Sequence, residues 1–76
     1  MKLYLGGHLS WYAPQRVSHL EIRLEQPTAL SAVVSRLRLP LGEIMLSAVN
    51  GTLVRLETAE VCDSDDVELH PPNGAG

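Results

Sequence analysis

The chain has 76 residues, a formal net charge of −3 and one cysteine. This length provides one domain with a single core, close to the lower limit for a chain that folds without disulfides or metals. Such a core provides too little wall for the deep pocket of an enzyme. A single cysteine excludes an intramolecular disulfide, and it excludes metal and iron–sulfur sites built from several cysteines.

Charge is divided unevenly along the chain. Residues 1–56 carry six basic and three acidic side chains, whereas residues 57–76 carry six acidic side chains and no Lys or Arg. An acidic segment repels nucleic acid and favours a partner with a basic surface, although acidic residues also serve simply to solvate a loop. No apolar run has the length of a bilayer span, and the first residues lack the apolar core of a signal peptide. We therefore expect a cytoplasmic protein that binds neither nucleic acid nor membrane.

The first third of the chain predicts two strands. Leu3-Tyr4-Leu5 is a short apolar run that is interrupted by Gly6-Gly7. Residues 10–14 follow as a turn or a short helical connector. From residue 17 to residue 24 apolar and polar side chains alternate, with Leu20, Ile22 and Leu24 on one face. This period of two predicts a half-buried strand that pairs with the first strand as a hairpin.

The period of the apolar residues then becomes helical. They recur at Leu30, Val33, Val34 and Leu37. This spacing predicts an amphipathic helix. Thr28 is the expected N-cap, because its hydroxyl can accept a hydrogen bond from a free backbone N–H group. Pro40 is expected to stop the helix soon after Arg38.

The rest of the chain predicts three strands. Residues 44–49 are mostly apolar and residues 52–54 return as a short strand. Between them Asn50-Gly51 is the strongest turn signal, because both residues tolerate the positive φ of a type I′ hairpin turn. A polar loop over residues 58–66 leads to a last alternating strand over residues 67–70. Pro71-Pro72 ends this strand, because proline cannot donate to a sheet ladder.

The element order is therefore β-β-α-β-β-β. It predicts an α+β domain over residues 1–72, with one helix packed across a mixed sheet of four to five strands. Residues 73–76 are expected to form a flexible tail. The predicted core contains Leu20, Ile22, Leu30, Val33, Val34, Leu37 and Leu69.

Four segments of the sequence carry a family resemblance together. They are Trp11-Tyr12-Ala13-Pro14, the predicted helix over residues 29–40 with its Leu-Pro end, Ala48-Val49-Asn50-Gly51, and the acidic strand, Pro-Pro and glycine tail over residues 63–76. At this spacing they resemble the MoaD/ThiS family of ubiquitin-like sulfur carrier proteins. The resemblance implies a ubiquitin-like β-grasp fold, in which the first and last strands lie side by side at the sheet centre. Two positions depart from the family pattern: Ala75 replaces a tail glycine, and Ser64 replaces the glycine of an Asp-Gly-Asp turn.

The resemblance implies a protein cosubstrate, not an enzyme. An E1-like adenylating enzyme would transfer AMP from ATP to the carboxylate of Gly76, and sulfur would then displace AMP to leave a thiocarboxylate. A sulfur-accepting synthase subunit would use that sulfur in cofactor biosynthesis, and the chain would be the small subunit of a molybdopterin synthase-like complex. Pro71-Pro72 resembles the molybdopterin branch more than the thiamine thiazole branch. Asn73, Gly74 and Ala75 would enter the partner's active site, and the chain itself would bind no cofactor.

A charged surface is the second candidate site. It consists of the acidic residues Asp63, Asp65, Asp66 and Glu68. We expect it to face a basic surface of the partner, helped by apolar residues on the open face of the sheet.

Other chemical groups in the sequence suggest structural roles. If the first, second and last strands are neighbours, Tyr4, His19 and His70 share the solvent face of the sheet. Two imidazoles without a third ligand do not suggest a metal site. Cys62 lies among acidic residues, which disfavour a thiolate. Trp11 and Tyr12 are expected to cover the edge of the core.

Two further hypotheses belong to other functional classes. The first is a ubiquitin-like binding module that is never activated and acts only through protein–protein contacts, and Ala75 favours it. The second is a small electron carrier on the same fold, which is excluded because the chain has a single cysteine.

Overall fold

The alternating strands at the two ends of the chain lie side by side at the centre of one sheet. The computed structural model describes residues 1–72, and the predicted tail over residues 73–76 lies outside the described residues. The five-stranded sheet has the order β2-β1-β7-β4-β5. Its strands are β1 (Lys2–Leu5), β2 (His19–Glu21), β4 (Leu46–Val49), β5 (Thr52–Val54) and β7 (Asp66–His70).

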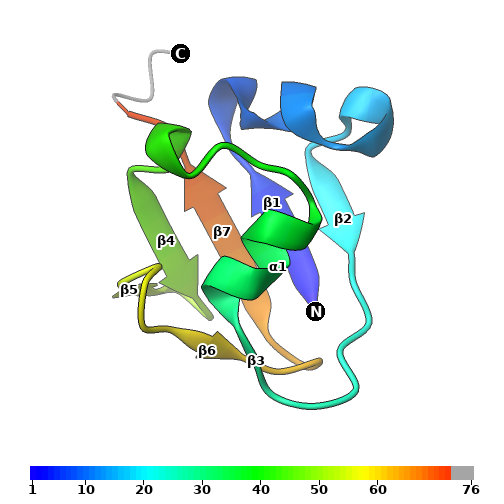
Figure 1. The fold of residues 1–76 in the computed structure, drawn as a ribbon, viewed down its shortest axis with the longest axis vertical. Helices are drawn as coiled ribbons and strands as arrows, with labels where there is room; N and C mark the ends of the chain where they lie inside the picture. Colours follow the sequence, from blue (N-terminus) through cyan, green and yellow to red (C-terminus); the bar gives the residue numbers. More distant parts are fainter. Residues whose placement is uncertain (73–76) are drawn as a thin grey trace.

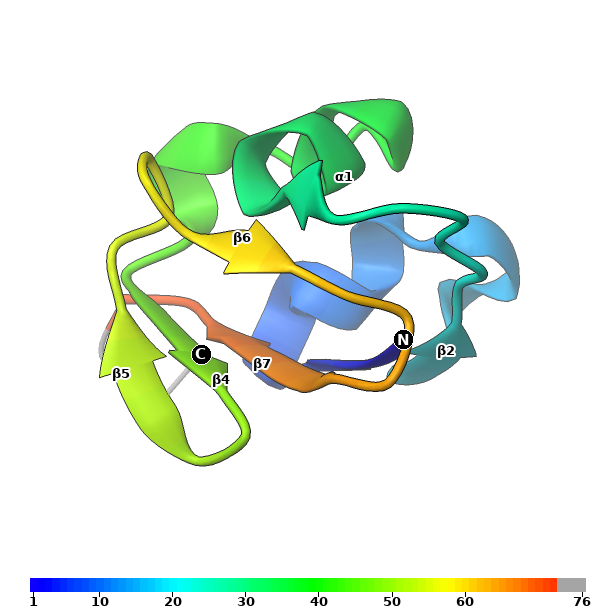
Figure 2. The same ribbon diagram turned by 90° about the horizontal axis from the view of Figure 1, so that it is seen from below.

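The sheet is mixed, because one of its pairs is parallel. Strand β1 pairs parallel with β7, with Leu3 beside Val67, and antiparallel with β2. Strand β4 pairs antiparallel with both β7 and β5. Helix α1 (Leu30–Arg36) lies on one side of this sheet (Figures 1 and 2). The predicted α+β fold, a ubiquitin-like β-grasp with one helix across a mixed sheet, is confirmed.

A second sheet was not expected from the sequence. Strand β3 (Thr28–Ala29) pairs antiparallel with β6 (Glu60–Val61) beside the start of α1. The predicted polar loop over residues 58–66 is therefore wrong in part, because Val61 is fully buried and anchors this short ladder. Thr28 is not the N-cap of the helix. Its hydroxyl donates to the carbonyl oxygen of Gln26 at 2.8 Å, and Ala29 occupies the cap position without a side-chain hydrogen bond.

The helix is shorter than predicted, and Pro40 is not what stops it. The N–H of Leu39 donates to the carbonyl of Val34, and the N–H of Arg38 donates to the carbonyl of Ser35. Arg38 has a φ of 58°, in the left-handed region. This pair of bonds and the left-handed residue form a Schellman motif, which ends the helix at Arg36.

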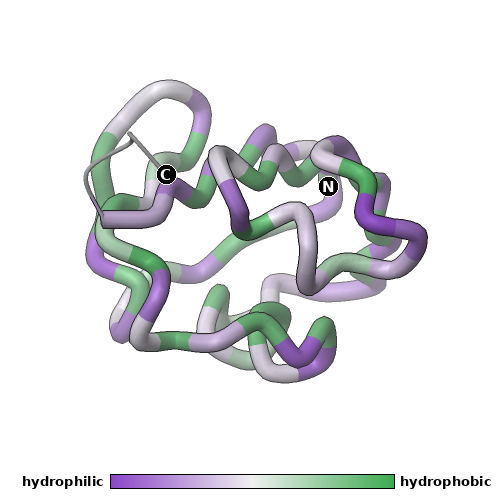
Figure 3. The backbone as a smooth tube through the Cα atoms, turned by 90° about the horizontal axis from the view of Figure 1, so that it is seen from above, coloured by the Kyte–Doolittle hydropathy of each residue, from purple (hydrophilic) through white to green (hydrophobic). Residues whose placement is uncertain are grey.

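Apolar side chains from both layers form one core. Of the predicted members, Leu30, Val33, Val34 and Leu69 are buried, while Leu20, Ile22 and Leu37 are partly buried and pack against them. Leu3, Leu5, Leu9, Val61 and Val67 complete the set of large, fully buried side chains. Colouring by hydropathy shows hydrophobic and hydrophilic residues following one another closely along the chain, as the strand period requires (Figure 3).

Short 3₁₀ helices replace part of the predicted connections. η1 (Gly7–Tyr12) and η2 (Pro14–Arg16) form the expected connector between β1 and β2. The strand predicted from residue 44 begins at Leu46, because η3 (Leu41–Glu43) precedes it. The hairpin between β4 and β5 has the predicted positive φ values, 52° at Asn50 and 84° at Gly51.

Candidate functional site

The central strand β7 carries the chain to the place where the predicted reactive tail begins. At the end of β7 lie His70 and the buried Pro71, after which the chain passes through Pro72 into residues 73–76. Connectors η1 and η3 lie at this same end of the sheet (Figure 1). We call this the exit end of the molecule. Gly76, Asn73, Gly74 and Ala75, the predicted reactive terminus and its approach, lie outside the described residues.

Two glycines allow η1 to pack against the end of β7. A Cβ on Gly6 would lie 2.7 Å from Nδ1 of His70, and a Cβ on Gly7 would lie 2.8 Å from Cγ of Pro71. Gly7 also has a φ of 52°, a backbone conformation that residues other than glycine rarely adopt. The Gly6-Gly7 pair, which in sequence only interrupts a strand, thus permits the close approach that places η1 beside Pro71.

A polar contact joins the two connectors at the exit end. Nε2 of His8 in η1 lies 2.8 Å from Oε1 of Glu43 in η3. The ring of Tyr12 stands edge-on to His8, with centroids 6.4 Å apart. The backbone N–H of Met45 donates to the carbonyl of His70 at 2.8 Å and holds the segment after η3 against β7.

Exposed apolar side chains lie on and beside the connectors at this end. Trp11 is 70% exposed and Tyr12 is 47% exposed, so the prediction that they cover the edge of the core is wrong. Leu41 in η3 and Met45 after it are also exposed, at 51% and 62%. We call these four residues the collar. η1 turns Trp11 and Tyr12 outward because its buried residue is Leu9, which occupies the core position instead.

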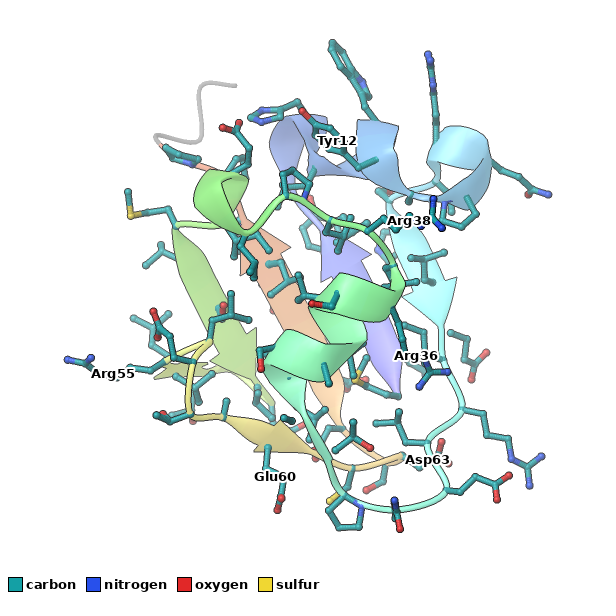
Figure 4. The ribbon with its side chains drawn as sticks, viewed as in Figure 1. Tyr12, Arg36, Arg38, Arg55, Glu60 and Asp63 are labelled. Atoms are coloured by element: carbon teal, nitrogen blue, oxygen red, sulfur yellow. The ribbon has the colours of Figure 1, made fainter. Side chains whose placement is uncertain are left out.

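Three of the four predicted acidic residues, Asp63, Asp65 and Asp66, lie at the other end of β7. This strand begins at Asp66 and ends at His70, so its own rise separates the two ends by about 13 Å at 3.3 Å per residue. Figure 4 shows Tyr12 at one end of the molecule and Asp63 and Glu60 at the opposite one. Of the four acidic residues, the structure therefore brings only Glu68, which contacts His70, near the exit end.

Two of the predicted acidic residues make internal hydrogen bonds. Oδ1 of Asp63 accepts from the backbone N–H of Leu24 at 2.8 Å and lies 3.4 Å from the α-amino group of Met1. The hydrogen bond from Leu24, followed by the charge of the α-amino group, lowers the pKa of the Asp63 carboxyl. Asp63 thus fastens the segment after β2 to the loop before β7.

Asp65 closes the turn that precedes β7. Its carboxylate accepts from the N–H of Cys62 at 2.7 Å and from the side-chain amide of Asn50 at 2.9 Å, and these bonds lower its pKa in that order of size. The N–H of Asp65 itself donates to the carbonyl of Cys62. Ser64 does not have a positive φ, so this turn does not require the glycine of the family pattern.

The other two acidic residues are on the open face of the sheet. Asp66 pairs in register with Lys2, and Glu68 with Tyr4. Oε1 of Glu68 lies 3.1 Å from Nε2 of His70, an exposed contact. These two carboxylates are accessible to a partner, so the prediction of a partner-facing acidic surface now rests mainly on Asp66 and Glu68.

Tyr4, His19 and His70 do share the open face, as predicted. The ring of Tyr4 lies 5.0 Å from that of His19 and 5.8 Å from that of His70, centroid to centroid. Tyr4 therefore stands between the two imidazoles. Within residues 1–72 no group of three or more His, Cys, Asp or Glu residues could hold a metal ion.

Comparison with known proteins leaves the fold as the main guide to function. No protein-family model matches the sequence, and no curated protein matches it significantly. In the part of the chain that the structure describes, no helix is long and apolar enough to cross a membrane.

The collar is the feature that the sequence analysis missed. Its residues come from two connectors about thirty positions apart, so no local pattern joins them. The available signal was Trp11-Tyr12 itself, since two adjacent aromatic residues in a connector cannot both turn toward one small core.

Proposed function

We propose that this chain is a sulfur carrier protein whose C-terminal glycine, Gly76, is adenylated and then thiocarboxylated by a partner activating enzyme. The observation that supports the proposal is a β-grasp domain whose central strand β7 runs through Pro71-Pro72 directly into Asn-Gly-Ala-Gly. In this proposal the reactive carboxylate follows the end of the central strand by six residues.

The proposed chemistry uses only the terminal carboxylate of the chain. One carboxylate oxygen of Gly76 attacks the α-phosphorus of ATP, and pyrophosphate leaves with the electrons of the broken P–O bond. Hydrosulfide then attacks the carbonyl carbon of the acyl-adenylate and displaces AMP. The product is a thiocarboxylate in which sulfur has replaced one oxygen. The activating enzyme supplies the ATP site, and the chain supplies the nucleophile.

The last four residues suit delivery of a carboxylate into a narrow active site. Gly74 and Gly76 have no side chain, and Ala75 carries only a methyl group. Pro71-Pro72 stiffens the start of this segment, because proline fixes φ and favours an extended chain. The chain is in this proposal a cytoplasmic cosubstrate and the small subunit of a molybdopterin synthase-like complex. Its second partner is the sulfur-accepting synthase subunit.

Intact-mass measurement tests the proposal. The chain is incubated with ATP, sulfide and the activating enzyme from its own source, and a thiocarboxylate adds about 16 Da, the difference between sulfur and oxygen. Deleting Gly76 should abolish this gain and leave the denaturation midpoint unchanged, because the residue lies beyond the core. Appending one residue should be nearly as harmful, since it moves the carboxylate by about 3.3–3.6 Å.

Ala75→Gly is the matched variant within the tail. With an activating enzyme of the sulfur-carrier family, this variant should be adenylated at the same or a higher rate than the wild type, since it removes the only side chain from the last three residues. A wild-type chain that gains neither AMP nor sulfur with its own activating enzyme would contradict the proposal.

A non-activated ubiquitin-like binding module is the alternative function. Ala75 favours it, because a methyl group near the terminus hinders passage through a channel shaped for two glycines. This alternative predicts that the chain binds its partners but gains neither AMP nor sulfur with any activating enzyme, so binding and intact mass measured together distinguish the two functions.

A further inference from the structure

We propose that the collar, formed by Trp11, Tyr12, Leu41 and Met45, is the surface that docks on the activating enzyme around the entrance to its active site. The inference rests on the proposed function, because it takes Gly76 as the reacting residue. The partner surface that fits the collar is an apolar rim on a protein, and it surrounds the opening that receives the tail.

The reach of the chain is the first argument. Four residues follow Pro72, and a fully extended chain spans at most about 3.3–3.6 Å per residue. The carboxylate of Gly76 therefore reaches no farther than about 14 Å from Pro72. An enzyme that encloses this carboxylate must bring its own surface within that distance of the exit end.

The connectors that carry the collar pack against the exit end. Gly7 of η1 lies against Pro71, and Met45 is hydrogen-bonded to His70. The contact between His8 and Glu43 ties η1 to η3, so the two connectors that carry the collar are held together at this end. A partner that surrounds the tail cannot avoid these connectors.

The composition of the collar is the second argument. Tryptophan and tyrosine dominate the energetics of protein interfaces, and methionine is enriched there. A tryptophan that is 70% exposed on a domain this small leaves a large apolar surface in water. The collar holds four of the seven large hydrophobic side chains that are exposed in residues 1–72. This concentration at one end is what a docking surface requires, whereas scattered apolar residues are ordinary.

The charges near the collar indicate how it binds. Glu43 lies beside the collar and its carboxylate contacts His8, whereas Asp63 lies at the opposite end of the molecule and Asp66 at the start of β7, away from the exit end. Contact through the collar is therefore mainly apolar, and its dissociation rate should depend little on ionic strength.

Two collar variants and one comparison variant test the inference. Trp11→Ser and Met45→Ser each remove an exposed apolar side chain without opening the core. Leu53→Ser is the comparison variant, because Leu53 is 67% exposed on β5 and shares the open face of the sheet with Glu68, so it tests the other apolar surface that a partner could use. The dissociation constant for the activating enzyme is measured by calorimetry without ATP, and the KM and kcat of each variant are measured in adenylation.

The expected result is a rise of about 5- to 30-fold in both the dissociation constant and KM for each collar variant, the range of a single interface residue of 1–2 kcal/mol. kcat should stay unchanged, and the Leu53→Ser variant should behave as wild type. Collar variants that bind as wild type, or a loss of equal size in the Leu53→Ser variant, would overturn the inference.

The two proposals fail in different ways. If the collar variants are adenylated with the KM of the wild type, the docking role of the collar is refuted and the sulfur-carrier function is not. Tight binding that is weakened by Trp11→Ser, with no adenylation of the wild type, overturns the sulfur carrier and keeps the collar as a docking surface. Absence of any binding between the wild-type chain and the enzyme overturns both.

Discussion

Single carboxylates in this protein have roles that their positions in the sequence do not reveal. Asp63, Asp65 and Asp66 stand within four residues of one another, yet each has different partners. Asp63 accepts from the backbone of Leu24, and Asp65 holds the turn before β7. Only Asp66 leaves its carboxylate free on the sheet face. Hydrogen bonding to backbone N–H groups explains why the pKa values of Asp63 and Asp65 are lowered.

These two carboxylates should make stability depend on pH in the acid range. Their folded pKa values lie below the ordinary value of 3.8, so the unfolded chain binds protons first as the pH falls. The stabilisation is therefore fully present above that ordinary pKa, and it is lost as the pH decreases through the lower folded pKa values. Urea midpoints measured from pH 7 to pH 2 should fall over this interval.

Asp63→Asn is the test variant for this pH effect. The amide keeps an acceptor for the N–H of Leu24 but removes the charge. The variant should therefore be less stable at pH 7, and its urea midpoint should change less as the pH falls. Glu57→Gln, a change at an exposed carboxylate outside these contacts, should retain the wild-type slope. Identical slopes for Asp63→Asn and the wild type would refute the role assigned to Asp63.

Helix α1 shows how a local motif decides the length of an element. The apolar spacing continues to Leu37, but the helix ends at Arg36 because Arg38 adopts a left-handed conformation. Glycine is the usual residue at this position, since an L side chain there costs roughly 1–2 kcal/mol. Buried Leu39, which packs with the core just after this turn, explains why the conformation is kept.

Arg38→Gly should therefore stabilise the protein. We expect the free energy of unfolding to rise by about 1 kcal/mol, because glycine removes the steric cost and the Schellman hydrogen bonds remain. Denaturant titration measures this change. Arg36→Gly is the matched control at the last helical residue, and it should instead destabilise by roughly 0.5–1 kcal/mol through helix propensity. A loss of stability in the Arg38→Gly variant would contradict the assigned motif.

At the scale of the whole molecule, the apolar collar lies at the end opposite to Glu60, Asp63, Asp65 and Asp66, whereas Glu43 and Glu68 lie nearer the collar. This separation assigns them different tasks in association. Short-range apolar contact belongs to the exit end, where the tail begins. Long-range attraction to a basic partner surface belongs to the acidic end, because Coulomb forces act over about a Debye length of roughly 10 Å in 0.1 M salt.

Charge reversal at the acidic end should slow association with the activating enzyme. The double change Glu60→Lys and Asp66→Lys shifts the net charge from −3 to +1, because each replacement adds two charges. Both side chains are exposed, whereas Asp65 is left unchanged because it holds a turn. The association rate should fall severalfold at low salt and lose its salt dependence.

Stopped-flow rates over a range of salt concentrations check this prediction. The neutral double change Glu60→Gln and Asp66→Asn is the control, and it should give an intermediate rate. Association rates that respond neither to salt nor to either double change would exclude electrostatic steering by this end.

The sequence by itself determined the elements whose signals are local. The apolar run of β1, the alternation of β7 and the spacing of Leu30, Val33 and Val34 are local signals, so these elements were predicted, together with four of the thirteen buried core residues. The Asn50-Gly51 turn was predicted because its positive φ values depend on those two residues alone. The family resemblance, not the pattern, suggested that β1 and β7 are neighbours.

Only the tertiary structure decided which distant residues meet. The pairing of β3 with β6, the bond from Leu24 to Asp63 and the assembly of the collar all join segments separated by about 30 residues or more, and no local period encodes such contacts. The outward position of Trp11 was decided the same way. Leu9 fills the core beneath η1, and the small core has no room for the neighbouring aromatic side chains.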